Sequence, residues 1–425
     1  MRLLLLSNTT GYQANAFREA AEQVGVPITL ATDRCHVLED PWGDAAIPVK
    51  FHEPVESARA IAKQAEQTPF TAMVAIGDAP TLTAALAAEM LGLKFHSPAA
   101  VEACRNKWMA RERFKAAGLM TPWYQRVPAD ENPRELVVEV PFPCVLKPLG
   151  LSASRGVIRA NGGGEFVEAF HRIGHLLRGI QHPSQGQTRA PNRAPSDEHW
   201  IQIESYIPGE EFALEGIVTN GDLKPLALFD KPDPLEGPYF EETIYVAPSR
   251  LPVSVQSAIV ATTQRAVTAL GLTHGPIHAE MRLNETGVWM LEIAARPIGG
   301  LCAKSLRFGR QRMPLEELIV RHALGEDISR LEREEEASGV MMIPIPSGGF
   351  YEGVKGVEQA ERVEGIESVE ITAKLQQKLV PLPEGASYLG FIFARGETPQ
   401  RVEQALREAH GCLRFQISAE IPVVK

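Results

Sequence analysis

The chain has 425 residues, with 43 Lys and Arg against 53 Asp and Glu, which gives a formal net charge of −10 at pH 7. Apolar residues make up 44% of it, enough for substantial hydrophobic cores, and its length suggests about three domains. The acidic balance argues against binding of nucleic acid or an anionic membrane, because neutralising a phosphate backbone needs an excess of Lys and Arg on one face.

The five cysteines indicate a reducing compartment. They are odd in number and widely separated, and no CxxC spacing occurs, so neither a disulfide framework nor a zinc site is encoded. We therefore expect a cytoplasmic protein. The apolar run at residues 3–6 is too short for a signal peptide or a membrane span, and it predicts a buried first strand.

Short apolar runs alternate with helical periodicity through the first hundred residues. Strands are expected at 3–6, 28–31 and 73–76, and helices at 13–24, 55–67 and 80–91. This alternation predicts a parallel sheet built of right-handed crossover units, so we place an open α/β domain at residues 1–97. Polar residues at the strand ends, at 7–11 and 77–78, are interpreted as either ligand-binding residues or turn residues.

A larger α+β region is expected at residues 98–330. Ser97 precedes Pro98 as a helix N-cap, and Asn106 caps a second helix that begins at Lys107. The Asn-Gly pair at 220–221 and the turn at 284–287 indicate hairpins between strands. The expected strands are 143–148, 199–207, 211–218, 224–230, 243–246, 276–283 and 288–293.

Two polar stretches interrupt this pattern. Residues 181–198 hold almost no apolar side chain and are predicted to be a mobile surface loop, because they cannot offset the entropy lost on ordering. The acidic run at 330–338 is interpreted as a linker or a solvated helix. We therefore place a domain boundary at 330 and expect a C-terminal α+β domain at 331–425.

Two glutamates in a predicted hairpin suggest a metal site. Glu280 and Glu292 lie on its two strands, and cross-strand neighbours have Cβ atoms about 4.5–5.5 Å apart. Two carboxylates this close repel each other unless a cation lies between them, and Mg²⁺ prefers such ligands. The alternative is a pair of solvent-facing glutamates. Arg296, which follows Glu292 closely, favours the metal site.

A lysine at a strand end precedes a loop of small residues. Lys147 ends an apolar strand, and the loop at 149–157 contains Ser152 and Ser154 between glycines. Glycines let backbone N–H groups approach phosphate closely, and the lysine adds positive charge. The loop has neither a Walker A sequence nor the GxGxxG spacing, so a flexible connection is the alternative. Its residues 152–156 are also the candidate lid over the site.

A further strand ends in a segment suited to a planar base. Main-chain groups at 205–207 follow Glu204 and could pair with such a base, and Glu211, after a Pro-Gly turn, could accept hydrogen bonds from ribose hydroxyls. Taken alone, the segment is equally a strand and a turn.

In this order, these elements resemble the ATP-grasp superfamily. The similarity covers about residues 100–325, and the N-terminal α/β unit is similar to the domain that commonly precedes an ATP-grasp module. Within the superfamily, the Leu-Glu-Ile-Ala-Ala-Arg-Pro string at 291–297 and the Tyr-Leu-Gly-Phe-Ile-Phe-Ala-Arg-Gly segment at 388–396 resemble L-amino acid ligases, also called dipeptide synthetases.

The resemblance implies a set of site residues. The implied ATP-binding residues are Lys107, Lys147, Ser152, Ser154, Glu204, Tyr206, Ile207 and Glu211. Glu280 and Glu292 would bind magnesium, and Mn²⁺ would also fit. Arg296 and Lys147 would be catalytic, Arg296 by stabilising the acyl phosphate and the charge that develops as the amine attacks. His278 and Arg296 would contact substrate, although a packed histidine is the alternative for His278.

The implied reaction joins a small carboxylate to an amine through an acyl phosphate and releases ADP and phosphate. One departure from the superfamily is Ala294, because many relatives have asparagine two residues after the second metal glutamate, so the number of metal ions stays open. Two other functions stay open as well. One is a bicarbonate-dependent carboxylase of the same fold, of the biotin carboxylase or aminoimidazole ribotide carboxylase type, and the other is a non-catalytic ATP-binding protein. A homodimer is expected from the resemblance alone.

Overall fold

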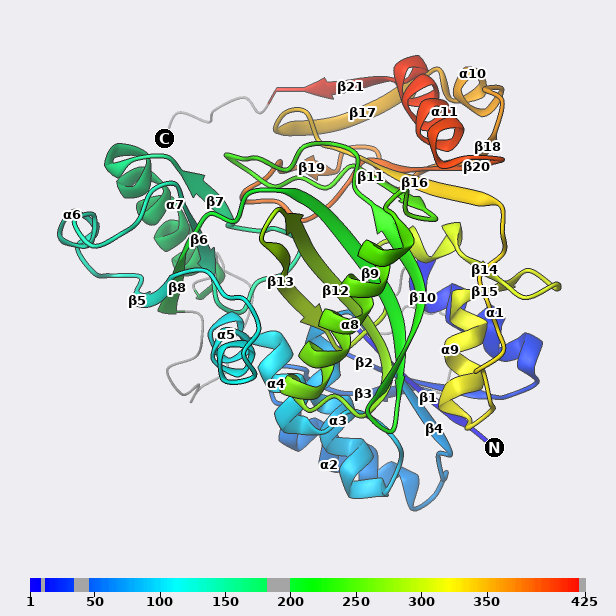
Figure 1. Cartoon of the computed structure of the whole chain (residues 1–425). Coiled ribbons are helices and arrows are strands. Elements are labelled where there is room, and N and C mark those ends of the chain that lie inside the picture. The colour runs from blue at the N-terminus through cyan, green and yellow to red at the C-terminus, as the bar shows by residue number, and fades with distance from the viewer. Residues whose placement is uncertain (9–11, 34–45, 182–198, 420–425) are drawn as a thin grey trace.

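The structure is a computed structural model that describes residues 1–8, 12–33, 46–181 and 199–419 (Figure 1). Residues 9–11 of the polar strand-end segment and residues 182–198 of the predicted mobile loop lie outside this range. Among the described residues, no helix combines the length and the apolar character needed to cross a membrane.

The N-terminal residues form the predicted parallel sheet, with strand order β3-β2-β1-β4. Its elements are β1 (Leu3–Ser7), α1 (Tyr12–Val24), β2 (Ile28–Thr32), β3 (Ala46–Pro48), α2 (Pro54–Ala65), β4 (Ala72–Ile76) and α3 (Asp78–Leu91). Alternate leucines of β1 join different cores, one with α1 and the other with α2 and α3. Both faces of the sheet are therefore covered, which explains why β1 is apolar throughout.

Two short helices lead into the central region, α4 (Pro98–Arg105) and α5 (Lys107–Ala116). The Ser97 side chain accepts a hydrogen bond from the Ala100 N–H at 3.3 Å, and the Asn106 side chain accepts one from the Met109 N–H at 3.0 Å. Both predicted N-caps are confirmed, and the second fixes the position of Lys107 at the first turn of α5.

A small antiparallel sheet, of order β5-β8-β6-β7, follows in the chain. It consists of β5 (Tyr124–Pro128), β6 (Cys144–Pro148), β7 (Ile158–Ala160) and β8 (Trp200–Ser205), with α6 (Pro133–Leu136) and α7 (Gly163–Gln181) beside it. Helix α7 packs on β6 and β7. Lys147 and Glu204 lie on the neighbouring strands β6 and β8 of this sheet.

The largest sheet has eight strands in the order β13-β12-β9-β10-β11-β16-β20-β18 (Figure 1). The strands are β9 (Glu210–Thr219), β10 (Asp222–Asp230), β11 (Ile244–Ala247), β12 (His274–Asn284), β13 (Gly287–Ala294), β16 (Ala337–Ile343), β18 (Ile366–Ile371) and β20 (Gly390–Gly396), and α8 (Val253–Leu270) packs against them. The hairpin turns predicted at 220–221 and 284–287 are both confirmed.

Strands from both sides of residue 330 share this sheet, so the C-terminal part is built onto the central one. The domain boundaries at 97 and 330 stay predictions. The acidic run contains no helix, and its last two residues begin β16. The remaining elements are η2 (Cys302–Ser305), β14 (Arg307–Phe308), β15 (Met313–Pro314), α9 (Leu315–Ala323), β17 (Gly349–Lys355), α10 (Val357–Glu361), β19 (Lys378–Leu379), α11 (Pro399–Cys412) and β21 (Arg414–Ser418).

Candidate active site

A cavity of about 690 Å³ is lined by residues from the N-terminal sheet, the small sheet, the large sheet and the C-terminal part. It brings together every site residue that the sequence predicts. These residues are Lys107, Lys147, Ser152, Ser154, Glu204, Tyr206, Ile207, Glu211, His278, Glu280, Glu292 and Arg296. Residues up to 189 positions apart in the chain, Lys107 and Arg296, therefore line one cavity, although their individual roles stay predictions.

The two predicted metal glutamates face each other across the hairpin. Glu280 on β12 pairs directly with Glu292 on β13, next to a bulge in the β12–β13 ladder. Glu292 makes no hydrogen bond or ion pair with any residue that the structure describes, although its side chain lines the cavity. A carboxylate without a protein partner, opposite a second carboxylate, has the oxygen donors that a hard cation such as Mg²⁺ prefers. The donor set therefore fits the ion, and buried Ala294 supplies no further ligand.

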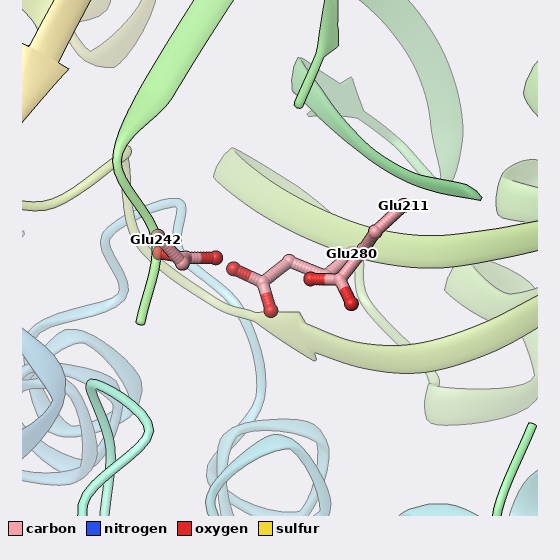
Figure 2. A group of neighbouring side chains, drawn as sticks. All are labelled: Glu211, Glu242 and Glu280. Atoms are coloured by element: carbon pink, nitrogen blue, oxygen red, sulfur yellow. The ribbon is translucent and has the colours of Figure 1, made fainter. Parts of the chain in front are cut away.

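A second acidic group lies beside this pair. Carboxylate oxygens of Glu211, Glu242 and Glu280 all lie within 4.8 Å of one another and point toward a common centre (Figure 2). The buried ammonium of Lys231 pairs with all three, at 2.9 Å from Glu211 and 3.4 Å from Glu280. Burial lowers the pKa of Lys231, but the three carboxylates outweigh it and hold the pKa well above its ordinary value. The Lys231 ammonium therefore offsets part of the negative charge of these three carboxylates.

His278 joins two buried carboxylates. Its Nδ1 lies 2.9 Å from Glu215, its partner in the β9–β12 ladder, and its Nε2 lies 3.3 Å from Glu280. Burial lowers the pKa of His278, yet the hydrogen bonds with Glu215 and Glu280 outweigh it and raise the pKa to about 9. A charged His278 orients Glu280, and contact with substrate stays a prediction.

The carboxylate of Glu204 is fully engaged inside the protein. It accepts hydrogen bonds from Arg111 Nε at 2.6 Å, from Lys147 Nζ at 2.5 Å and from Gln202 Nε2 at 2.6 Å. Burial raises the pKa of Glu204, but Arg111 and Lys147 outweigh it and lower the pKa to about 2. The side chain therefore orients Lys147, and the adenine contact of Glu204 stays a prediction.

The segment after β8 has fewer free main-chain donors than its sequence indicates. The N–H of Ser205 donates to Trp123 O and that of Tyr206 donates to Pro143 O, each at 2.9 Å. For the N–H of Ile207, no partner is found among the described residues. Only this last donor lies free at the cavity wall, where a base would meet it.

Glu211 and Tyr206 share one cation, Arg282. Arg282 Nε donates to Glu211 at 3.0 Å, its partner in the β9–β12 ladder. Arg282 Nη1 donates to the Tyr206 hydroxyl and to Ile207 O, each at 2.8 Å. This buried arginine locks the segment after β8 onto the large sheet, which gives Glu211 a fixed position for the predicted ribose contact.

Arg296 is held by the N-terminal sheet. Asp78 begins α3 directly after β4, and its carboxylate accepts two hydrogen bonds from Arg296, at 2.8 and 3.1 Å. The Asp78 carboxylate also accepts a hydrogen bond from the Ser152 hydroxyl. The guanidinium keeps an edge on the cavity while its orientation is set by Asp78.

Sequence reasoning missed two residues that build the site, Arg111 and Glu215. It left Asp78 open between a ligand-binding residue and a turn residue, and the structure places Asp78 on the cavity wall beside Arg296. A usable signal existed for Glu215, since strand alternation puts it on the same face of β9 as the predicted site residue Glu211. No pattern marks Arg111, which lies on a helix far from Glu204 in the chain.

Three protein-domain families match parts of this chain. The ATP-grasp N-terminal domain family matches residues 18–94, the ATP-grasp domain family matches 140–305, and the L-amino acid ligase C-terminal domain 2 family matches 341–418. The chain is therefore similar to ATP-grasp proteins over its N-terminal and central parts, and its C-terminal part is similar to the L-amino acid ligases.

The alanine--anticapsin ligase of Bacillus subtilis (strain 168) is 32% identical over 223 residues, which is 51% of this chain and 46% of that protein. The crystal structure of L-amino acid ligase from Bacillus licheniformis superposes with a TM-score of 0.79 at 24% identity, and the match covers 98% of each chain. The carboxyaminoimidazole ribonucleotide synthase of Aspergillus clavatus complexed with ATP gives a TM-score of 0.68 at 17% identity, over 96% of this chain and 98% of that one. The two structural matches show the fold. Because the chain spans about half the length of the first of these relatives, its activity is a proposal.

Proposed function

We propose that the protein is an ATP-dependent ligase that joins a carboxylate to an amine, with release of ADP and phosphate. The supporting observation is that one cavity collects two lysines, two opposed carboxylates and an arginine, the groups that such chemistry needs. Similarity to the alanine--anticapsin ligase supports amino acids or similar small molecules as both substrates.

The nucleotide would lie between the two sheets. The free N–H of Ile207 would donate to the base, and Glu211 would accept hydrogen bonds from the ribose. Lys147, held by Glu204 at the end of β6, would contact the phosphates together with Lys107. Magnesium held by Glu280 and Glu292 would offset the negative charge of the phosphate oxygens.

The first step would form an acyl phosphate. A carboxylate is a poor electrophile at neutral pH, so its oxygen attacks the γ-phosphoryl group and ADP leaves. The protein contributes mostly position and charge, because Lys107 and Lys147 approach the transferred group from fixed places. Lys107 is fixed by a hydrogen bond from its Nζ to Leu151 O at 2.6 Å.

The second step would form the C–N bond. The amine attacks the acyl carbon, the tetrahedral oxyanion lies against Arg296, and phosphate leaves with the bonding electron pair and takes up the proton that the nitrogen loses. Water must stay out until then, because it would hydrolyse the acyl phosphate. The loop at 149–157, whose Ser152 is held by Asp78, is the proposed cover.

Part of the cavity lining suits a small organic substrate. Cys302, Met342, Tyr388 and Phe391, from η2 and the C-terminal part, contribute apolar surface to it. Apolar lining together with charged groups in one cavity matches an amino acid, which carries an apolar or neutral side chain beside an ammonium and a carboxylate.

A screen of phosphate release tests the proposal. Amino acids would be supplied singly and in pairs with ATP and Mg²⁺, with bicarbonate in place of amino acids as a control, and products would be identified by mass spectrometry. Phosphate release that needs a particular pair, with equal formation of the condensed product, is expected. Release driven by bicarbonate would favour the carboxylase, and ATP binding without turnover under every condition would favour a non-catalytic protein.

The four cysteines that the structure describes are free thiols, which supports the proposed cytoplasmic location. The proposed homodimer rests on the family resemblance.

A further inference from the structure

The loop at 149–157, called the phosphate loop below, is fastened to a segment of the C-terminal part. The N–H of Gly156 donates to Pro383 O at 2.8 Å, and Arg155 Nε donates to Glu384 O at 2.8 Å. These contacts join residues nearly 230 positions apart. They are separate from the contacts that Lys107 and Asp78 make with the same loop.

The carboxylate of Glu384 adds a third contact, with helix α7 of the small sheet. Arg172 Nε donates to one oxygen at 2.5 Å and Arg172 Nη2 donates to the other at 2.9 Å. This bidentate geometry is directional as well as electrostatic. Arg172 also donates to the Tyr239 hydroxyl, so its guanidinium is held in place. The main-chain carbonyl of Glu384 therefore holds the loop, while its carboxylate anchors the same turn to the helix behind the loop.

The backbone on each side of this contact is specialised. In the loop, Ala153 and Ser154 have φ of 56° and 53°, which L residues adopt at a cost, so the loop depends on outside contacts for its shape. In the C-terminal segment, Gly385 N–H donates to Pro381 O at 2.9 Å, and a Cβ at 385 would lie 1.7 Å from Val380 O. Only glycine completes this turn, which presents Glu384 to the loop.

The same segment forms a wall of the cavity. Ala386, Ser387 and Tyr388 line the cavity directly after the turn that presents Glu384. A substrate that contacts these three residues therefore touches the same short segment that grips the phosphate loop.

We propose that Glu384 is a positioning residue that fastens the phosphate loop in its closed position when substrate fills the cavity beside residues 386–388. This inference rests on the proposed ligase function and adds a link between the two ends of the site. The loop would cover the nucleotide most tightly when the substrate is in place, which protects the acyl phosphate from water.

The size of the effect follows from the exposure of the pair. The side chains of Arg172 and Glu384 are 43% and 38% exposed, so the pair contributes little to global stability. Its effect should appear in the opening of the loop instead, as a change of up to about fivefold in the rate at which nucleotide leaves.

The experiment measures release of a fluorescent ATP analogue from the full-length protein by stopped flow, with and without amino acids. Glu384→Gln and Arg172→Gln are expected to speed release by up to about fivefold, with no further gain in the double variant, and to leave the melting temperature unchanged. The swapped pair Glu384→Arg with Arg172→Glu should slow release again. In turnover, the single variants should release more phosphate than product.

A matched control is Arg407→Gln. Arg407 is also 43% exposed and also joins the C-terminal part to the central region, through Asp233, but neither residue of this pair has a main-chain contact with the phosphate loop like that of Glu384. It should leave release unchanged. Wild-type release rates and an unchanged ratio of phosphate to product in both Glu384→Gln and Arg172→Gln would overturn the inference. Release is measured without turnover. A wild type that binds the analogue but is inactive would therefore reject the ligase function, while the release rates would still test the role of Glu384. A wild type that does not bind the analogue would reject both.

Discussion

Asp78 and Arg296 lie 218 residues apart in the chain and form a bidentate ion pair across two sheets. Asp78 is the first residue of α3, which packs on the N-terminal sheet, and Arg296 follows β13 of the large sheet. The Arg296 side chain is only 12% exposed, and besides Asp78 its Nη1 donates to Pro297 O at 3.0 Å. The N-terminal residues are thus part of the site and not merely attached to it.

Replacing Asp78 should impair turnover more than nucleotide binding. In Asp78→Ala, Arg296 loses its bidentate partner and Ser152 loses an acceptor, so the guanidinium moves away from the place where the oxyanion forms. We expect kcat to fall by about tenfold or more, with little change in KM for ATP. Asp78→Asn keeps one acceptor oxygen, so its kcat should lie between those of Asp78→Ala and the wild type. A steady-state assay that found equal kcat in all three proteins would contradict this role.

Glu292 should be needed for the metal ion and not for the fold. Glu292→Gln keeps the size of the side chain but removes the free carboxylate opposite Glu280. Turnover should drop by about a hundredfold or more, and the Mg²⁺ concentration for half-maximal activity should rise. Glu285→Gln, at the exposed turn of the same hairpin, is the control and should behave as wild type. Unchanged activity of Glu292→Gln would reject the metal site.

The sequence predicted those parts of the site that depend on local patterns. Strand alternation placed His278 and Glu280 on one face, and the short turn after β12 brought Glu280 near Glu292, although only the structure shows that they are direct partners. Helix capping rules placed Lys107 at the start of α5, and the structure confirms that cap.

The parts that could not be predicted depend on long-range packing. Arg111 reaches Glu204 from a helix 93 residues earlier, and Lys231 reaches three carboxylates that come from β9, β12 and the segment before β11. No local spacing encodes such contacts, because they arise only when separate sheets pack together. For the same reason, the sequence did not reveal that the Glu204 carboxylate is already occupied.

Lys231 should stabilise the protein by neutralising its three glutamates. Lys231→Met leaves the carboxylates of Glu211, Glu242 and Glu280 together without their shared cation. We expect a loss of about 3 kcal/mol or more in the free energy of unfolding at pH 7.5, measured in urea. The loss should shrink at pH 5, because repulsion raises the carboxylate pKa values in the variant and protonation then relieves the repulsion.

Lys224→Met is the matched control for this comparison. Lys224 lies on β10, the strand that ends directly before Lys231, but its partner Glu332 is 78% exposed. Its loss should stay below about 1 kcal/mol at both pH values. If Lys231→Met cost no more than Lys224→Met, the ammonium would not be the cation that the acidic group requires.

Three buried histidines lie between the N-terminal residues and the large sheet. His96 Nδ1 accepts hydrogen bonds from the N–H groups of Thr273 and His274, at 3.1 and 3.2 Å, so its ring is neutral. The rings of His274 and His322 stack with centroids 4.2 Å apart. Burial lowers the pKa of His96 to about 3, and burial with the nearby His274 lowers that of His322 to about 4.

These histidines should make the protein sensitive to acid. Their pKa values in the folded protein lie below the unfolded value of about 6.5, so the unfolded chain binds protons first and stability falls as the pH drops from about 6.5 toward 4. Between pH 7.5 and 5, His322 alone should remove about 2 kcal/mol from the free energy of unfolding. His322→Gln keeps a hydrogen-bond partner for Thr219, and its free energy of unfolding should fall by about 2 kcal/mol less than that of the wild type over this interval. His52 is exposed, so the fall in His52→Gln should equal that of the wild type. Urea unfolding curves at the two pH values measure both differences, and an equal loss in His322→Gln and wild type would show that His322 is not the titrating group.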